Sequence, residues 1–419
     1  MEHFHLQDTI LQCEDVPLPA IAEAVGTPVY VYSTATMLRN TRVLRDALAP
    51  LGDPLISYAV KANPNAAVLA TLAREGLGAD VVSGGEYRRA RAAGIAPEKI
   101  VFAGVGKTAE EMALALEGGL FQFNLESLEE AEMLSQVAVR LGRTAPVGFR
   151  VNPDVEAGTH AKISTGAAEN KFGVLYAEAA AAYARAAALP GLRVQGVGVH
   201  IGSQLTSLAP LRHAFMKVGA LLTDLRGAGH AITVADLGGG LGVPYNPDQA
   251  SPPSPAAYGE MVQEVTRDWG VRLVFEPGRL IVANAGVLLT RVIRVKPGAA
   301  NPFLVVDAGM NDLMRPTLYD AWHAIEAVAP KGRRATVTVV GPVCETGDTF
   351  ATGRHMDEVE AGDLVVFRTA GAYAAAMSST YNSRPLTPEV LVHGDRWAVV
   401  RPRLDIQALI DADAVPDWL

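Results

Sequence analysis

Short apolar segments alternate with amphipathic or alanine-rich segments between Leu55 and Arg279. The apolar segments have the length of buried strands, and the segments between them have the length and capping signals of helices. Eight strands are predicted on this pattern, at 55–60, 79–83, 100–103, 122–125, 147–151, 195–200, 233–237 and 272–276. About eight strand–helix units in about 225 residues favour a closed (β/α)8 TIM barrel, although a doubly wound open sheet alternates in the same way.

Capping signals mark the start of several of these helices. Capping boxes, in which Ser or Thr precedes Glu by three residues, are predicted for Ser83 with Glu86, Thr108 with Glu111, and Ser127 with Glu130. After the first barrel strand, Asn63 is predicted as an N-cap and Pro64 as the first helical residue.

The pattern changes after Arg279, where short β-type segments are broken by Gly and Pro. They lie at 287–295, 303–307, 335–340, 363–368, 390–392 and 397–400. They predict a second domain that is all-β, of the sandwich or barrel-like kind. The apolar run at 28–32 precedes the alternation and is a candidate strand of this domain. We therefore expect a barrel domain at 36–280 and a β domain formed by 1–35 and 281–419.

Two long connections need a functional explanation. The loop after the fifth strand, at 152–172, and the proline-rich loop at 246–255 exceed or approach the usual length of a loop without structure of its own.

Composition narrows the class of protein. A chain of 419 residues is expected to form two domains, and a net charge of −9 argues against a nucleic-acid partner. Two cysteines, Cys13 and Cys344, cannot form a disulfide framework or a zinc site, so no metal is expected. The first residues lack the pattern of a signal peptide, and no apolar run reaches about 18 residues. A soluble, cytoplasmic protein without a membrane partner is expected.

Lys61 stands at the end of the first barrel strand, which is an unusual place for a lysine. In barrels of this kind, chemistry takes place at the carboxyl ends of the strands. Partial burial there lowers the pKa of an amine and frees the lone pair needed to form a Schiff base. The alternative is a lysine that extends to solvent, which is the common case for a single lysine.

The ends of later strands carry further candidate groups. His200, after the sixth strand, could stack on an aromatic cofactor ring or be a hydrogen-bonded structural residue, and Ser203 could donate to a phosphate. The turn at 236–242 has four glycines in five positions, a density that we find hard to explain by packing and that suits an anion-binding turn. Glu276 could pair with a pyridinium nitrogen and Arg279 could bind a carboxylate, unless the two form only a surface ion pair.

Together, these groups are the components of a pyridoxal 5′-phosphate site: an amine, a phosphate-binding turn, an acid and a stacking ring. The motifs Tyr-Ala-Val-Lys-Ala-Asn at 58–63, His-Ile-Gly-Ser-Gln at 200–204, Gly-Gly-Gly-Leu-Gly at 238–242 and Glu-Pro-Gly-Arg at 276–279 resemble the decarboxylase branch of the alanine-racemase-fold pyridoxal enzymes.

More specific motifs resemble the diaminopimelate decarboxylase family within that branch. They lie at 310–319, around Arg315, and at 341–348, around Cys344, with supporting matches at 169–173 and 371–373. The resemblance covers about 28–381, nearly the whole chain. It implies a head-to-tail homodimer with shared active sites, in which the Cys344–Glu345 motif enters the neighbouring subunit's site.

The resemblance also implies a role for each site residue. Lys61, His200, Glu276 and Cys344 would be catalytic, with Cys344 as the acid that reprotonates the substrate carbon. The implied cofactor-binding residues are Lys61, Asp80, His200, Ser203, Gly238, Gly239, Gly240, Glu276, Gly278, Arg279 and Tyr373. The implied substrate-binding residues are Arg279, Arg315, Tyr319, Glu345 and Tyr373.

The residue types agree with a substrate that carries an amino-acid group at both ends. Arg315 could bind a distal carboxylate and Glu345 a distal ammonium. The resemblance, supported by these residue types, implies decarboxylation of meso-2,6-diaminopimelate to L-lysine, the last step of lysine biosynthesis. A related ornithine- or arginine-type decarboxylase and a non-catalytic regulatory relative are the alternatives. An inert buried Cys344 would weaken the prediction.

Overall fold

The computed structural model describes residues 3–156, 165 and 170–419. Its contacts divide the chain into two compact units. We call Leu38–Pro244 with Ala250–Ile281 the barrel unit, and Met1–Met37, Tyr245–Gln249 and Val282–Leu419 the β unit. Each is described by itself. The long loop at 152–172 lies mostly outside the described residues.

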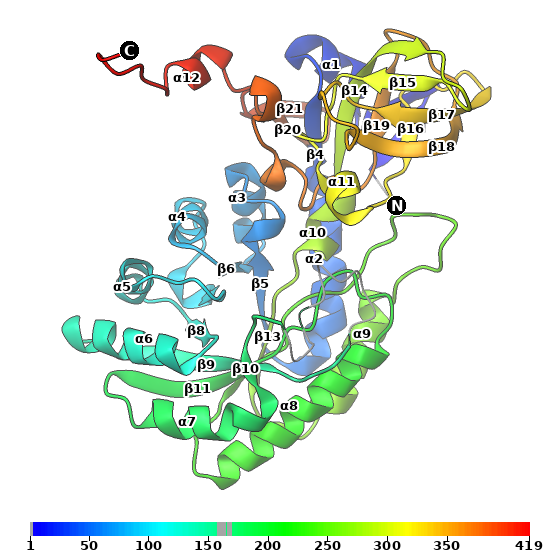
Figure 1. Cartoon of the computed structure of the whole chain (residues 1–419). Coiled ribbons are helices and arrows are strands. Elements are labelled where there is room, and N and C mark those ends of the chain that lie inside the picture. The colour runs from blue at the N-terminus through cyan, green and yellow to red at the C-terminus, as the bar shows by residue number, and fades with distance from the viewer. Residues whose placement is uncertain (1–2, 157–164, 166–169) are drawn as a thin grey trace. The chain divides into compact units, whose positions relative to one another are not determined.

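The barrel unit contains eight parallel strands that close on themselves (Figure 1). In order around the barrel they are β5 (Leu55–Ala59), β6 (Gly78–Val81), β7 (Ile100–Phe102), β8 (Gln122–Leu125), β9 (Ala145–Asn152), β11 (Leu192–Gly198), β12 (Val234–Asp236) and β13 (Arg272–Phe275). The last strand, β13, pairs in parallel with the first, β5, so the sheet has no open edge here. The predicted closed barrel is confirmed, and the open sheet is excluded.

Helices lie before, between and after the strands of the barrel unit. They are α2 (Thr34–Leu48), α3 (Ala66–Arg74), α4 (Gly84–Ala92), α5 (Ala109–Gly118), α6 (Leu128–Arg140), α7 (Ala179–Ala187), α8 (Ala209–Gly227), α9 (Pro255–Thr266) and α10 (Arg279–Val282). No helix in the described part of the chain is long and apolar enough to cross a membrane.

The predicted capping boxes are formed in part. Thr108 and Glu111 make the complete reciprocal pair at the start of α5. Ser83 and Ser127 also accept the expected backbone N–H at the starts of α4 and α6. The glutamates of those two helices, however, accept N–H groups one residue upstream of the cap, at Val82 and Glu126. They therefore tie the preceding loop to the helix.

The helix after Lys61 begins later than predicted. Asn65 is the N-cap of α3, because its side chain accepts the N–H of Ala67 at 2.9 Å. Asn63, the predicted cap, accepts the N–H of Asn65 instead. Lys61 lies in a short 3-10 turn, Val60–Ala62, between β5 and α3. Because the 3-10 turn at Val60–Ala62 delays the start of the helix, Asn65 and not Asn63 becomes the N-cap.

The β unit has a nine-stranded sheet. Seven of its strands follow in the order β18-β17-β15-β14-β4-β20-β21, and β19 pairs with β14 and with β16. Its strands are β4 (Val29–Ser33), β14 (Gly286–Lys296), β15 (Phe303–Val306), β16 (Ile325–Ala327), β17 (Arg334–Val340), β18 (Thr349–Asp357), β19 (Leu364–Phe367), β20 (Glu389–His393) and β21 (Arg396–Arg401). The early candidate strand, β4, belongs to this sheet, where it lies between β14 and β20. The sequence reading missed β16 and β18.

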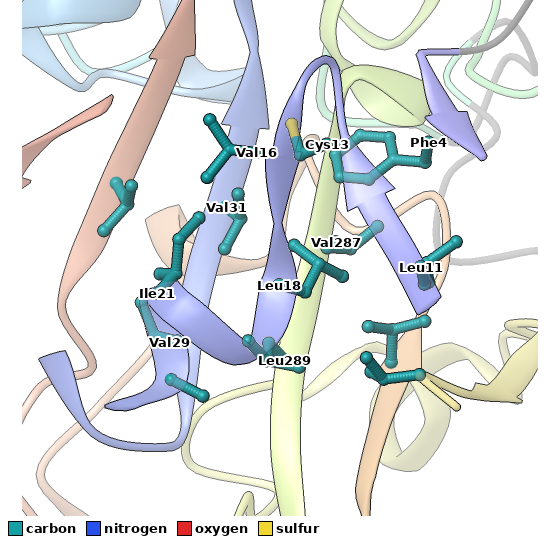
Figure 2. Close-up of a cluster of buried hydrophobic side chains, with 14 of the residues drawn as sticks. Phe4, Leu11, Cys13, Val16, Leu18, Ile21, Val29, Val31, Val287 and Leu289 are labelled. Atoms are coloured by element: carbon teal, nitrogen blue, oxygen red, sulfur yellow. The ribbon is translucent and has the colours of Figure 1, made fainter. Parts of the chain in front are cut away.

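The amino-terminal segment covers part of this sheet. Strands β1 (Phe4–Gln7), β2 (Ile10–Cys13) and β3 (Val16–Pro17) and helix α1 (Leu18–Val25) contribute apolar side chains to a core shared with β4 and β14 (Figure 2). Cys13 is fully buried in this core, where burial raises the pKa of its thiol. It is a structural residue.

The β unit also contains two short helices, α11 (Arg315–Tyr319) and α12 (Ile406–Ile410).

Candidate active site

Lys61 interacts with a buried carboxylate. Its Nζ atom donates to Oδ2 of Asp80 at 3.2 Å, and the Asp80 side chain, on β6, has no exposed surface. The other Asp80 oxygen, Oδ1, is buried without a hydrogen-bond partner in the part of the chain that the structure describes. The Lys61 side chain is 42% exposed, so the amine is both held in place and accessible. The pairing argues against a lysine that merely extends to solvent.

Glu276 follows β13 and lies next to a second buried carboxyl group, Asp236. Partial burial raises the pKa of Glu276 well above its usual range, and the charges of Asp236 and Asp80 raise it further. The pKa of Asp236 is also raised, mainly by burial. Asn124 donates to Asp236 at 2.7 Å, and the Gly238 N–H donates to the same carboxyl group at 2.9 Å. Two adjacent carboxyl groups of this kind favour a proton on one of them, and Glu276 has the larger shift.

His200 is held in one orientation and is neutral. The N–H of Gly239 donates to its Nδ1 atom at 3.2 Å, so Nδ1 is the acceptor and the ring proton is on Nε2. Burial lowers the pKa of His200 well below its usual value, and the positive charges of Arg150 and Lys61 lower it further. A neutral imidazole is suited to lie against an aromatic ring.

The glycine turn after β12 is packed tightly against its neighbours. A Cβ at position 239 would lie 2.1 Å from the Glu276 carbonyl oxygen, and one at 240 would lie 2.3 Å from that of Gly202. Gly240 also has a φ of +107°, which disfavours a side chain. Packing therefore accounts for these glycines, although their density in the sequence was hard to explain in that way. The phosphate-binding role of Gly238, Gly239 and Gly240 stays a prediction.

Arg279 and Ser203 form a polar pair in the barrel unit. Arg279 begins α10 and is buried, and its Nη2 donates to Ser203 Oγ at 3.0 Å. The preceding residue, Gly278, accepts the N–H of Ile281 and so starts the helical turn. A buried guanidinium beside a hydroxyl group suits an anionic ligand, a phosphate or a carboxylate.

Arg150, which the sequence did not point to, contacts the candidate site residue His200. It lies on β9, and its Nη2 donates to the His200 carbonyl at 3.1 Å, while Nη1 lies 3.4 Å from Glu126. Its guanidinium is also 4.6 Å from the ring centre of Phe172. A charged residue within an otherwise apolar strand was the available signal. Glu169, from the same supporting motif as Phe172, lies outside the described residues.

The polar interior of the barrel also escaped the sequence reading. Gln122 donates to Asn124 at 2.8 Å, and both are buried on β8. A Cβ at Gly148 or Gly196 would come within 3.0 Å of the Gln122 side chain, so these glycines make room for it. Alternate polar residues on a buried strand were the signal. Asn124 in turn donates a hydrogen bond to Asp236, so this pair helps to hold the Asp236 carboxyl group in place.

The remaining predicted site residues belong to the β unit. Arg315 begins α11 and is buried, whereas Tyr319 at the end of the same helix is partly exposed. Tyr373 lies after β19 with a φ of +54°, which is uncommon for a residue with a side chain.

Cys344 and Glu345 lie on the loop between β17 and β18, and both are exposed. The N–H of Cys344 donates to Asn382 Oδ1 at 3.0 Å. Tyr381, next to Asn382, hydrogen-bonds the Glu345 carboxylate, and this interaction raises the Tyr381 pKa. The cysteine is thus not an inert core residue.

Asp348 anchors this loop. Its carboxylate accepts the N–H groups of Val343 and Met310, each at 2.6 Å. Thr317, on α11, donates to the Gly347 carbonyl at 2.8 Å. The loop that carries Cys344 and the helix that carries Arg315 are therefore joined to each other within the β unit.

The barrel residues fit pyridoxal phosphate. Lys61 provides an accessible amine beside a carboxylate, and Glu276 provides an acid whose raised pKa favours a retained proton. His200 provides a neutral ring, and Arg279 with Ser203 provides a cation and a hydroxyl group for an anion. All of them follow strands of one barrel at its carboxyl end.

Comparisons with known proteins identify the family of this chain. Residues 35–283 match the family model of the pyridoxal-dependent decarboxylases, pyridoxal binding domain. The diaminopimelate decarboxylase of Zymomonas mobilis is 53% identical over 418 residues, which cover 99% of both proteins. That of Pseudomonas aeruginosa is 50% identical over 416 residues, again 99% of both.

Solved structures are similar over the same length. The diaminopimelate decarboxylase of Helicobacter pylori, complexed with L-lysine, is 38% identical with a TM-score of 0.91, over 94% of this chain and 98% of that chain. The diaminopimelate decarboxylase of M. jannaschii, also with L-lysine, is 36% identical with a TM-score of 0.95, over 99% of this chain and 98% of that chain.

Proposed function

Because this chain belongs to the diaminopimelate decarboxylase family of pyridoxal-dependent decarboxylases, we propose that it converts meso-2,6-diaminopimelate to L-lysine and carbon dioxide. This is the last step of lysine biosynthesis, and we place it in the cytoplasm. The observation that carries the proposal is the grouping of Lys61, Asp80, His200 and Glu276 at one end of the barrel. The L-lysine complexes of the structural relatives support the choice of product.

Pyridoxal phosphate, when bound, supplies an electron sink for the electron pair left behind by carbon dioxide. Lys61 Nζ holds the cofactor, and Asp80 keeps that amine oriented. Glu276 holds a proton at its carboxyl group for the ring nitrogen, because its surroundings raise its pKa. His200 is neutral and brings no positive charge to the ring.

The anionic end of the cofactor is assigned to a second set of groups. They are Ser203, Gly238, Gly239, Gly240, Gly278, Arg279 and Tyr373. Arg279 has the charge for a phosphate or a carboxylate, and it also serves the substrate in this proposal.

Substrate choice is assigned to Arg315, Tyr319, Glu345 and Tyr373. Arg315 binds the distal carboxylate and Glu345 binds the distal ammonium group. Lysine and ornithine lack the distal carboxylate and would leave the buried Arg315 without its ligand.

Cys344 Sγ delivers the proton to the carbon that has lost carbon dioxide. Its exposed position on the 341–348 loop suits a residue that completes a site in a second subunit. We therefore propose a homodimer with shared active sites, in which the β domain supplies substrate and dimer contacts.

The proposal is tested by incubating the holoenzyme separately with meso-diaminopimelate, L-lysine and L-ornithine, and measuring carbon dioxide release. We expect turnover with diaminopimelate only. Removal of a hydrogen-bonded charged partner costs about 2–5 kcal/mol, so Arg315→Ala should lower kcat/KM for diaminopimelate by about 30-fold or more. Ornithine turnover equal to that of diaminopimelate would instead support the basic amino-acid decarboxylase. No turnover by cofactor-loaded protein would support a non-catalytic relative.

A further inference from the structure

Arg315 contacts two aromatic side chains of the β unit, those of His323 and Tyr245. Its Nη1 atom lies 3.1 Å from Nε2 of His323, and its guanidinium carbon lies 4.8 Å from the ring centre of Tyr245. The rings of His323 and Tyr245 meet edge to face, with centres 5.4 Å apart and planes at 84°. Arg315 and His323 are both buried. The hydrogen bond to His323 and the cation–π contact with Tyr245 therefore both help to orient the guanidinium.

The hydrogen bonds assign the protonation state of His323. Its Nδ1 atom lies 2.8 Å from the carbonyl oxygen of Arg368, which can only accept, so Nδ1 carries the proton. Arg315 can only donate, so Nε2 must be the acceptor. Both bonds are made at once only by the neutral Nδ1–H form. A second proton, on Nε2, would place an N–H donor of His323 opposite an N–H donor of Arg315, and the hydrogen bond between them would be lost.

The surroundings of His323 hold it firmly. Its own carbonyl accepts from Arg354 Nη1 at 2.7 Å. Arg368, whose carbonyl orients the ring, is itself bound to Glu326 at 2.8 Å and to the Phe4 carbonyl at 3.1 Å. Such a support fixes the direction in which the Nε2 lone pair points.

Tyr245 immediately precedes the proline-rich loop at 246–255. Residues Tyr245–Gln249 group with the β unit, although the chain on both sides of them belongs to the barrel unit. The length of this loop, which the sequence alone left unexplained, allows an aromatic ring to contact the arginine.

We propose that His323 is a positioning residue that sets substrate specificity, holding the Arg315 guanidinium in the orientation that binds the distal carboxylate. Tyr245 supports the same guanidinium through its ring face. The inference rests on the proposed function, because it assumes that Arg315 binds substrate. His323 itself does not touch the reacting atoms and acts through Arg315.

Two substitutions separate the two hydrogen bonds of His323. The side chain of His323→Asn keeps a donor for the Arg368 carbonyl but is too short to accept from Arg315. His323→Gln is long enough to present an acceptor to Arg315. We expect His323→Asn to raise KM for meso-diaminopimelate by about tenfold with little change in kcat, as for one lost hydrogen bond to a charged group. His323→Gln should recover most of that loss.

A purely structural role predicts a different result. In that case both variants should lower thermal stability, cofactor loading and kcat together, without a selective rise in KM. Equal KM values for wild-type protein and His323→Asn would overturn the inference.

A double-mutant cycle with Arg315→Ala separates this inference from the proposed function. If His323 acts through Arg315, then His323→Asn should change KM by less than about twofold when Arg315 is already absent. A full, additive rise in KM in that background contradicts the positioning role. If Arg315→Ala alone leaves KM for diaminopimelate unchanged, it is the proposed function of Arg315 that fails.

Tyr245→Phe and Tyr245→Leu provide a matched pair for the second contact. The phenyl ring of the Phe variant keeps the face beneath the guanidinium, whereas the Leu variant removes it. We expect KM to rise for Tyr245→Leu only. Equal rises for both variants would assign the effect to the hydroxyl group and overturn the supporting role of the ring.

Discussion

Gly239→Ala is the substitution for which the structure gives the most direct expectation. Gly239 lies in the turn after β12, and its N–H donates to Nδ1 of His200. A methyl group at this position would meet the carbonyl oxygen of Glu276 at 2.1 Å. The substitution therefore forces apart two segments that both carry proposed cofactor contacts.

The magnitude follows from that distance. Real Cβ atoms essentially never approach a non-bonded heavy atom of a distant residue closer than 3.0 Å, so the turn or the Glu276 backbone must move by about 0.9 Å. Overpacking of this kind costs about 1–3 kcal/mol of stability. A misplacement near 1 Å at a catalytic group lowers the rate about 100-fold. We therefore expect a large loss of kcat/KM in a protein that is still folded.

The assay compares Gly239→Ala with Gly227→Ala. Gly227 is exposed at the end of α8, and a Cβ there would meet nothing within 4 Å. Pyridoxal phosphate affinity is measured by absorbance titration, kcat/KM by carbon dioxide release, and stability by urea unfolding. Gly227→Ala should behave as wild type. Wild-type cofactor affinity and kcat/KM in Gly239→Ala would refute the packing argument and the assignment of the turn to the cofactor site.

Three further predictions concern other parts of the site. Glu276→Gln should lower kcat by about 100-fold or more while pyridoxal phosphate still binds, because the ring loses its proton-holding acid; near-normal turnover would exclude that role. A mixture of inactive Lys61→Ala and Cys344→Ala subunits should recover activity in about a quarter of the sites after random exchange, and no recovery would place both residues in the site of one subunit. Burial raises the pKa of Asp348 from its ordinary 3.8 to about 6. The protonated carboxyl group therefore contributes to stability in full below pH 3.8, and this contribution is lost as pH rises through about 6. In urea unfolding, wild type should lose about 1–2 kcal/mol relative to Asp348→Asn between pH 4 and pH 7, and parallel pH profiles would contradict this.

Much of the architecture could be read from the chain alone. The eight barrel strands were predicted because each is a short apolar run bounded by helix-capping or turn signals. In the β unit, β18 was missed because few of its residues are fully buried and its strand conformation depends on pairing with β17. Pairing with a distant strand leaves little trace in local sequence.

The sequence by itself determined which chemical groups stand at the strand ends, since a parallel barrel brings the carboxyl ends of its strands together whatever the loops do. Lys61, His200 and Glu276 could be selected on that basis. Only the tertiary structure decided what each group contacts: Asp80 for the Lys61 amine, and a glycine N–H that fixes the His200 tautomer.

The same holds for the glycines of the turn and for His323. Packing against a carbonyl oxygen 37 residues further along the chain, at Glu276, accounts for Gly239, and no property of the turn sequence shows this. Nothing in the sequence distinguishes His323 from other histidines, and only the fold places it between Arg315 and the Arg368 carbonyl. Residue types limit which hydrogen bonds are possible, but distance and direction between distant segments select among them, and these are set by packing.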